Sequence, residues 1–277
     1  MKKLGNISVK WIYLIYVVAI AIPLFNPIGL PMSVTPEVRA FIDTIEGLPA
    51  GSVVWIGADF DPGSEPENGP QLTATFRHAM SRDLKVIILS FWAQAPDLVQ
   101  RIITPIAEEM GKEYGVDYVN LGYKPGAGTV LRAFTDEIIT PSGGVDHAGA
   151  RLEDMPLMRK VTALKRDQIG VVVSINVGSP GYGEYMTYIT DPFDIPLLSC
   201  PVAGTMTAQL PYLRSNQIRG MLPGLTGAAQ YEVDRRQPGK AAAQMDAQSI
   251  GHLVILLFVL MGNLGYLATR KEGASNK

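Results

Sequence analysis

The sequence predicts an α/β protein, in which an open, mostly parallel, doubly wound sheet of about five strands is flanked by a transmembrane helix at each end. Short β-branched runs alternate with segments of helical periodicity, which is typical of βα units. Near-continuous apolar runs at 86–89 and 171–173 indicate strands that are covered on both faces. Two long uncharged stretches, at 11–31 and 249–269, predict the membrane helices.

The composition of the 277-residue chain excludes several other classes of protein. Its 24 Lys and Arg residues nearly balance 26 Asp and Glu residues, while 47% of the residues are hydrophobic and 18% are charged. These values do not fit a disordered tail, a collagen-like repeat, a disulfide-stapled mini-protein or a strongly basic nucleic-acid binder. The single cysteine, Cys200, has no second cysteine with which to form an internal disulfide.

The N-terminal stretch, 11–31, contains no charged residue over 21 positions. At about 1.5 Å of rise per residue, a helix of this length matches a hydrocarbon core of roughly 30 Å. Lys2, Lys3 and Lys10, followed by Ala19-Ile20-Ala21, which resembles a small-residue cleavage site, also fit a cleaved signal peptide. Both apolar stretches also fit buried core helices. Because the apolar run continues well past that cleavage site, we expect an uncleaved anchor.

The C-terminal stretch, 249–269, is also free of charge over 21 residues and is most apolar at its centre, 253–260. Basic residues flank both stretches on their terminal sides: Lys2, Lys3 and Lys10 before the first, and Arg270, Lys271 and Lys277 after the second. By the positive-inside rule, the tails 1–10 and 270–277 then lie in the cytoplasm, and the domain at 32–248 lies outside it. We therefore expect a cell-membrane protein with two spans.

The predicted extracytoplasmic domain is acidic. Without the six flanking basic residues and Glu272, 18 basic and 25 acidic residues lie between the spans, a net charge of −7. Such a domain is not an obvious partner for nucleic acid or for anionic lipid.

Polar and small residues inside the two spans indicate how the spans pack. In an antiparallel pair, Asn26 and His252 lie at similar depth, where polar side chains often join helices. A proton or ion relay at His252 is the alternative. Asn263, between Gly262 and Gly265, marks a close packing face, within the molecule or with a partner. Self-association or other membrane-protein subunits are the expected partners.

The domain begins with an amphipathic helix at 36–46, since Thr35 is a suitable N-cap and Gly47 ends the pattern. Strands are predicted at short runs rich in β-branched or apolar residues: 53–58, 85–91, 116–121, 169–175 and 195–199. Helices are predicted where helical periodicity or a helix start signal occurs: 70–83, 97–114, 128–139, 156–165, 183–189, 205–216 and 227–235.

Ligands of open α/β sheets collect beyond the carboxyl ends of the strands. The first strand runs into Asp59 and Asp61, and Ser90 ends the second. A hydrophobic strand that ends in Asp-x-Asp resembles the haloacid dehalogenase phosphohydrolases, and Ser90 fits their second motif. With Lys124, these residues would make a metal-dependent hydrolase of phosphate esters, in which Asp59 and Asp61 hold the metal or act as nucleophile and acid. The fourth strand runs into Asn176 without an acidic pair, so we favour turn and helix-cap roles and predict no catalytic residue.

Two glycine-rich turns are the candidate anion sites. The turn after the third strand combines glycines, a lysine and a helix start, a combination that suits a phosphate or carboxylate, although a simple tight turn is the alternative. A second such turn follows the fourth strand. The candidate ligand-binding residues of the two turns are Lys124, Gly126, Gly128, Thr129, Asn176 and Ser179.

Neither a metal centre nor a cofactor is predicted. His78 lies in a predicted helix and His147 in a loop, with no ligand spacing between them, and no zinc signature occurs. Cys200 is expected to be a buried apolar group.

Three segments, 114–126, 224–232 and 245–249, resemble a family of uncharacterised prokaryotic membrane proteins with two spans and an α/β domain. The resemblance covers most of the chain and implies an architecture without a known activity. The sequence thus predicts a non-catalytic ligand-binding or scaffold subunit of a membrane assembly, with the metal-dependent hydrolase as the alternative.

Overall fold

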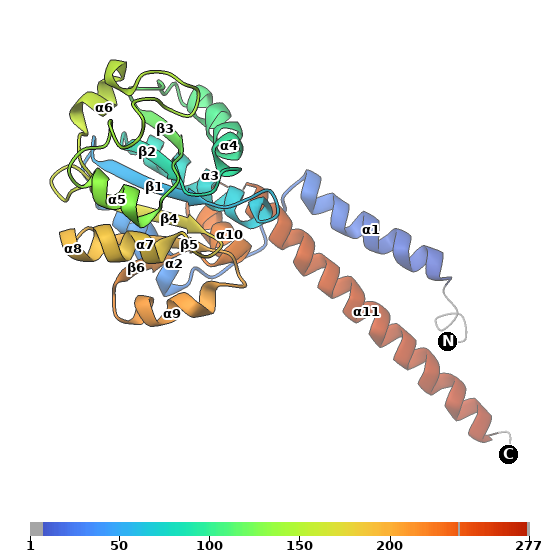
Figure 1. The fold of residues 1–277 in the computed structure, drawn as a ribbon. Helices are drawn as coiled ribbons and strands as arrows, with labels where there is room; N and C mark the ends of the chain where they lie inside the picture. Colours follow the sequence, from blue (N-terminus) through green and yellow to red (C-terminus); the bar gives the residue numbers. More distant parts are fainter. Residues whose placement is uncertain (1–7, 238, 276–277) are drawn as a thin grey trace.

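Six parallel strands form the centre of the structure, a computed structural model that describes residues 8–237 and 239–275, with side chains up to residue 267 (Figure 1). The strands are β1 (Val53–Asp59), β2 (Lys85–Ser90), β3 (Tyr118–Tyr123), β4 (Val171–Asn176), β5 (Leu197–Pro201) and β6 (Ile218–Met221). Their order is β3-β2-β1-β4-β5-β6, so the direction of winding reverses between β1 and β4. The predicted α/β fold with a parallel sheet is confirmed, and ligands of such sheets bind where the winding reverses.

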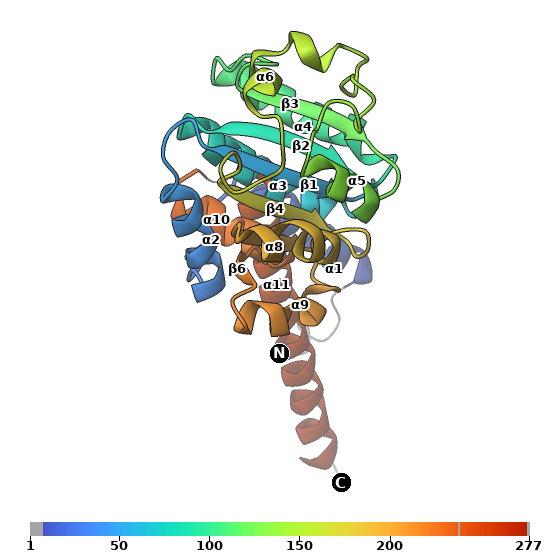
Figure 2. The same ribbon diagram turned by 60° about the vertical axis from the view of Figure 1, so that its left-hand side comes forward.

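Helices cover both faces of the sheet (Figures 1 and 2). The face that we call the α3 side is covered by α2 (Pro36–Glu46), α3 (Glu65–Ser81), α4 (Ala95–Glu109) and α10 (Gly224–Asp234). The α7 side is covered by shorter elements: α5 (Gly128–Phe134), η2 (Leu152–Asp154), α6 (Pro156–Lys160), α7 (Tyr182–Tyr185), the π-helical turn η3 (Met186–Thr190), α8 (Asp191–Phe193) and α9 (Met206–Arg214). Alternate strand residues supply the two cores, because successive side chains of a strand point to opposite faces.

The sheet has six strands where the sequence predicts about five. The additional strand, β6, is only 4 residues long and contains the exposed Arg219, so it lacks the apolar alternation of a typical strand. Helix α2 approaches this strand closely, because a Cβ added at Gly220 would lie 2.4 Å from the backbone nitrogen of Phe41. Glycine at this position is therefore required for α2 to pack against the edge of the sheet.

Two predicted helices end earlier than their sequence patterns indicate. The helix predicted at 128–139 ends at Phe134, and the one at 156–165 ends at Lys160. The segments that follow the two helices are hydrogen-bonded to each other instead. Ile138 N donates to Thr162 O (2.9 Å), and Leu164 N donates to Phe134 O (2.8 Å). These long-range backbone bonds replace the i to i−4 bonds that would have continued both helices.

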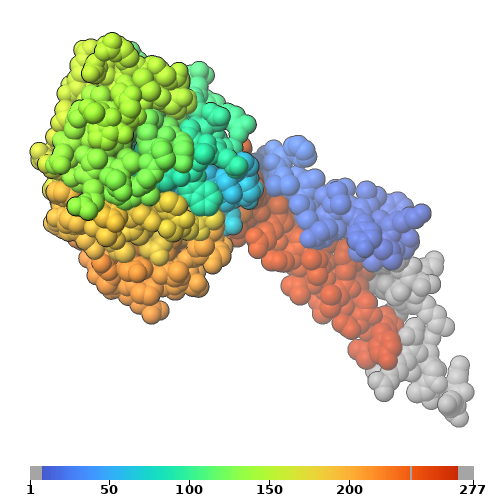
Figure 3. Space-filling model, viewed as in Figure 1, coloured from blue at the N-terminus to red at the C-terminus, as the bar shows by residue number. Residues whose placement is uncertain are grey.

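Two apolar helices lie side by side and project away from the domain (Figures 1 and 3). Helix α11 (Lys240–Ser275) has 36 residues, and, among the described residues, it alone is long and apolar enough to cross a membrane. Helix α1 (Val9–Phe25) has 17 residues and ends before the predicted 31, because Asn26 leaves the helical conformation. Helix α11 begins nine residues before the predicted 249.

The first two turns of α11 belong to the domain (Figure 2). Ala241 packs with Ala228 and Ala229 of α10, and further along α11 the Met245 sulfur lies 3.8 Å from the Thr226 hydroxyl. Since residue numbers rise along one helix as they fall along the other, α11 runs antiparallel to α10. It passes the start of α10, which follows β6, and then continues outward as the apolar helix.

Candidate functional site

The point where the winding reverses lies between the ends of β1 and β4, where Asp59 pairs in register with Asn176. Asp59 is fully buried on the α7 side, and its Oδ1 accepts a hydrogen bond from the backbone N–H of Phe91 (2.7 Å). Burial raises the pKa of Asp59 well above its ordinary value, and the negative charge of Glu184 acts in the same direction, against the Phe91 bond. The site therefore favours the neutral acid, which is a poor metal ligand.

Three buried polar atoms lie around Gly57. Within the described part of the chain, Asp59 Oδ2 has no hydrogen-bond partner, and the Tyr185 hydroxyl and the Trp55 indole nitrogen have no partner besides each other. Trp55, Gly57 and Asp59 are alternate residues of β1 and share one face of the sheet. The Tyr185 ring lies directly on Gly57, since an added Cβ would be 2.3 Å from that ring. An unpaired polar atom in a core destabilises the fold, so the carboxyl of Asp59 is maintained at the expense of stability.

Replacing Asp59 with asparagine is expected to raise the free energy of unfolding at pH values above neutral. An acid with a raised folded-state pKa is stabilising only when protonated, so its contribution is lost as pH rises above the ordinary value of 3.8. Asp59→Asn keeps an acceptor for Phe91 without a titrating group, and its unfolding free energy at pH 8 should exceed that of wild type by about 1–3 kcal/mol. Trp55 is fully buried, so tryptophan fluorescence follows unfolding in urea. If the unfolding free energy of Asp59→Asn exceeds that of wild type by the same amount at pH 4 and at pH 8, the raised pKa of Asp59 is contradicted.

Asn176 belongs to a fully buried polar network that joins β4, β5 and α9. Its Nδ2 donates to the hydroxyls of Ser174 and Ser199 (3.2 Å each), and its Oδ1 accepts from Gln209 Nε2 (2.8 Å). The Ser199 hydroxyl in turn donates to Gln209 Oε1 (2.5 Å). Each of these side chains is 0% exposed, so in this arrangement Asn176 holds two strands and a helix together.

Ser179 contacts an acid of the protein itself. Its hydroxyl donates to Glu184 Oε1 (2.8 Å), and the backbone N–H of Gly181 donates to Glu184 Oε2 (2.7 Å). Glu184 therefore accepts the bonds that a bound anion would accept at this turn. Across it, the Trp92 indole donates to Pro180 O (3.2 Å), which links the loops after β2 and β4.

The turn after β3 faces a hollow of about 460 Å³, which is also lined by Glu184, Tyr188 and Tyr212. Gly126 has a positive φ of 105°, and an added Cβ at Gly128 would lie 2.3 Å from the Tyr188 ring, so both glycines are required for this backbone path. Thr129 lies on the wall of the hollow.

Lys124 points away from this hollow. Its Nζ donates to Val145 O (3.2 Å), and burial lowers the pKa of Lys124, with the charge of Asp146 opposing that shift. The candidate anion residues are therefore not brought together, since Lys124 and Asn176 are bonded elsewhere. Glu184, which lines the same hollow as the turn, repels an anion there.

The remaining hydrolase candidates have local structural partners. Asp61 Oδ1 accepts from the backbone N–H (3.0 Å) and the hydroxyl (2.9 Å) of Ser64, just before α3 begins. The Ser90 hydroxyl accepts from Trp92 N (2.9 Å) and donates to Trp92 O (3.0 Å). Within the part of the chain that the structure describes, no three His, Cys, Asp or Glu residues lie together as metal ligands. This geometry supports turn and cap roles for Asp61 and Ser90.

The residues predicted to pack the two apolar helices differ in their surroundings. Asn26, His252, Gly262 and Asn263 are exposed, whereas Gly265 is buried. The close approach lies at Gly251 instead, where an added Cβ would be 3.4 Å from the Tyr16 hydroxyl and 3.6 Å from Ile20. Lys2, Lys3 and Lys277, and the side chains of Arg270 and Lys271, lie outside the described residues.

Two buried acids join α11 to the domain, and sequence reasoning did not single them out. Asp246 accepts the backbone N–H groups of Ile28, Gly29 and Leu30, at 2.8, 2.8 and 3.0 Å. It thereby ties α11 to the segment between α1 and α2. The sequence offers no local signal for this role, because the partners of Asp246 lie 216 to 218 positions away.

The second acid, Glu232, caps the start of α11. Its carboxylate accepts the N–H groups of Gly239 (3.0 Å), Ala241 (3.3 Å) and Ala242 (2.8 Å), which have no partner within the helix. Burial raises the pKa of Glu232, and these three bonds act against that shift. An acid at a helix N-terminus also interacts favourably with the helix dipole.

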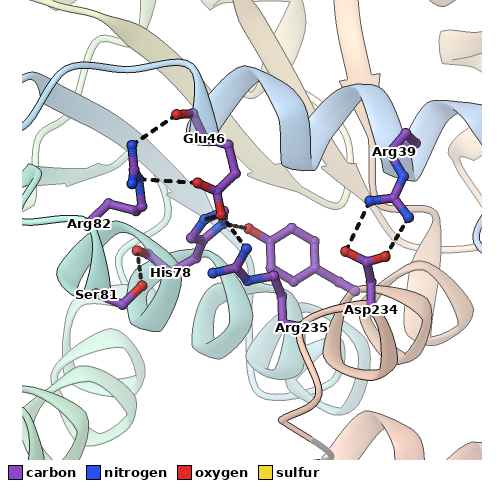
Figure 4. A network of polar contacts seen from close by, with 8 residues as sticks. Arg39, Glu46, His78, Ser81, Arg82, Asp234 and Arg235 are labelled. Carbon is purple, nitrogen blue, oxygen red and sulfur yellow. Dashed lines mark hydrogen bonds and ion pairs between the residues drawn. The ribbon is translucent and has the colours of Figure 1, made fainter.

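A further polar network lies between α2, α3 and α10 (Figure 4). The buried His78 contacts the Tyr231 hydroxyl through Nδ1 and Glu46 Oε1 through Nε2 (3.1 Å). Arg82 Nε lies 3.2 Å from Glu46 Oε2, and Arg235 contacts Glu46 Oε1. Burial and the charge of Arg235 lower the pKa of His78 to about 4. Neutral His78 therefore donates to Glu46 and accepts from Tyr231.

Beside this network, the guanidinium group of Arg39 donates two hydrogen bonds to the carboxylate of Asp234, which ties α2 to the end of α10. Three helices of the α3 side, α2, α3 and α10, are thus cross-linked at the end of α10 that leads into α11.

No family model, no curated protein and no solved structure matches this chain.

Proposed function

We propose that this protein is a membrane-anchored α/β domain that acts as a non-catalytic ligand-binding or scaffold subunit of a membrane assembly. One observation carries the proposal: α11 begins inside the domain, bound there by Glu232 and Asp246, and continues without interruption as an apolar helix. At about 1.5 Å per residue, its 36 residues extend about 54 Å. A helix fixed in this way transmits the orientation of the membrane segment to the domain.

The side chains on the projecting helices support two spans. Large apolar residues of α1 and α11 are exposed, many of them by half or more: Trp11, Tyr13, Val17, Ile22, Leu253, Leu256, Val259, Leu260 and Leu264. Soluble proteins rarely expose a continuous apolar surface of this extent. We infer that lipid covers both helices, with α1 as the second span and both termini in the cytoplasm.

The non-catalytic assignment is supported by the bonding of the hydrolase candidates. Asp59 is fully buried, while Asp61 and Ser90 are bonded within their own turns. Lys124 reaches Val145 O. A reaction at these residues would need these bonds to break before a substrate is met.

Cysteine labelling tests the arrangement in the membrane. The natural Cys200 is buried, so introduced cysteines can be compared directly. In intact cells, an impermeant maleimide should label Glu153→Cys, in an exposed turn of the domain, and should leave Lys10→Cys, at the start of α1, unlabelled until the membrane is opened. Labelling of Lys10→Cys but not of Glu153→Cys in intact cells would overturn the proposed orientation. Labelling at both sites would overturn the proposal that the chain crosses the membrane twice.

The mass of the particle tests the role as an assembly subunit. After extraction in mild detergent from cells with native expression levels, the protein should elute in a complex larger than the monomer of 30.0 kDa with its detergent. A monodisperse monomer that hydrolyses a generic phosphate ester with added magnesium would overturn the proposal in favour of the hydrolase.

A further inference from the structure

A hollow of about 590 Å³ lies where α3, α4, α10 and the first turn of α11 meet, away from the carboxyl ends of the strands. We call it the basic hollow. The charged residues that line it are Arg77, Arg101, Arg235, Lys240, Glu109 and Glu232. Four cations thus face two acids, although the domain as a whole is acidic.

The acids of the basic hollow are already engaged. Arg77 makes two parallel bonds to Glu109, at 2.7 and 2.8 Å. Glu232 is buried, and its oxygens accept the N–H groups at the start of α11. Glu109 is therefore neutralised by Arg77, and the oxygens of Glu232 are directed at the N–H groups of α11, so the hollow keeps an excess of cations over acids.

Two cations remain. Arg101, from the exposed face of α4, and Lys240, the first residue of α11, have neither an ion pair nor a side-chain hydrogen bond within the described part of the chain. Arg235 also lines the hollow, but its charge is paired with Glu46, which is not among the lining residues. The planar guanidinium group suits bidentate oxyanions, and an ammonium group adds a compact charge.

We propose that the basic hollow binds a phosphate group, free or carried on a larger molecule, through Arg101 and Lys240. The volume exceeds that of a phosphate ion and leaves room for the rest of such a molecule beside Thr73 and Ile102. The proposal goes beyond the proposed function, because it requires only the folded domain and the start of α11. Binding here would act on the same helix end that Glu232 holds.

The test compares two pairs of charge changes in the full chain. Arg101→Gln with Lys240→Gln removes both free cations of the hollow. Arg132→Gln with Lys160→Gln removes two exposed cations on the α7 side and is the matched control. All four residues are exposed, so both double variants should fold, which their unfolding temperature without added anion verifies.

In detergent, inorganic phosphate should raise the unfolding temperature of wild type and of the control more than chloride does at equal ionic strength. In the hollow variant, the apparent affinity for phosphate should fall at least about tenfold for each cation removed. This outcome identifies a soluble phosphate source.

A second arm uses nanodiscs of phosphatidylglycerol or phosphatidylcholine. If only the anionic nanodiscs stabilise wild type, and the hollow variant loses this stabilisation while the control keeps it, the phosphate group is a lipid headgroup. The proposal is overturned if neither source stabilises wild type, or if the hollow variant responds as the control does.

Discussion

Replacing Asp246 with alanine is expected to lower the free energy of unfolding by about 3–5 kcal/mol. The carboxylate of Asp246 is 3% exposed and accepts three backbone N–H groups from 28–30, which would be left without an acceptor. Asp246→Asn should have an intermediate effect, because the amide keeps one acceptor oxygen but has no charge. Unfolding in urea, with the chain in detergent and tryptophan fluorescence as the signal, measures all three proteins.

Gln248→Ala is the control for this prediction, since Gln248 is exposed on the same helix two residues further along. Its unfolding free energy should lie within about 0.5 kcal/mol of wild type. If Asp246→Ala is no less stable than this control, then Asp246 does not hold the segment between α1 and α2.

Lowering the pH from 7 to 4 is expected to remove about 3 kcal/mol of stability through His78 alone. The pKa of His78 is lowered from 6.5 to about 4 in the folded protein, chiefly by burial. Each pKa unit corresponds to about 1.4 kcal/mol. Because the folded-state pKa is the lower one, stability is complete above pH 6.5 and is lost as the pH falls toward 4.

The variant His78→Gln separates this contribution from that of the carboxylates, since glutamine can still donate to Glu46 but does not titrate. Its loss of stability between pH 7 and pH 4 should be smaller than that of wild type by about 3 kcal/mol. The chain has 3 histidines, so the variant also identifies the His78 signal in an NMR titration. A His78 signal that titrates near pH 6.5 would contradict the burial argument.

The fold was more predictable from the sequence than the contacts of its polar residues were. The strands around Asp59 and Asn176 lie in long apolar runs, and a buried strand is one of the few structures that such runs permit. In contrast, β6 is short and contains Arg219 and Gly220, and its place in the sheet depends on α2, far away in the sequence.

The contacts of the candidate site were less predictable because they too depend on residues that are far apart in the sequence. Residues at strand ends were identified correctly by position, but Asn176 contacts Gln209, 33 positions away, which no local spacing indicates. The partners of Asp246 are separated from it by 216 to 218 positions. Periodicity places His78 in a helix, whereas its partners Glu46 and Tyr231 come from two other helices.

The two attachments of α11 also bear on how the domain meets other molecules. In a chain that is anchored by α11, Glu232 and Asp246 remove most of the rotational freedom that a flexible tether would leave. Association normally requires the loss of that freedom, which is a substantial part of the unfavourable free energy of binding. For a domain fixed to its helix in this way, two anchored copies would have less orientational freedom to lose on association than two tethered ones.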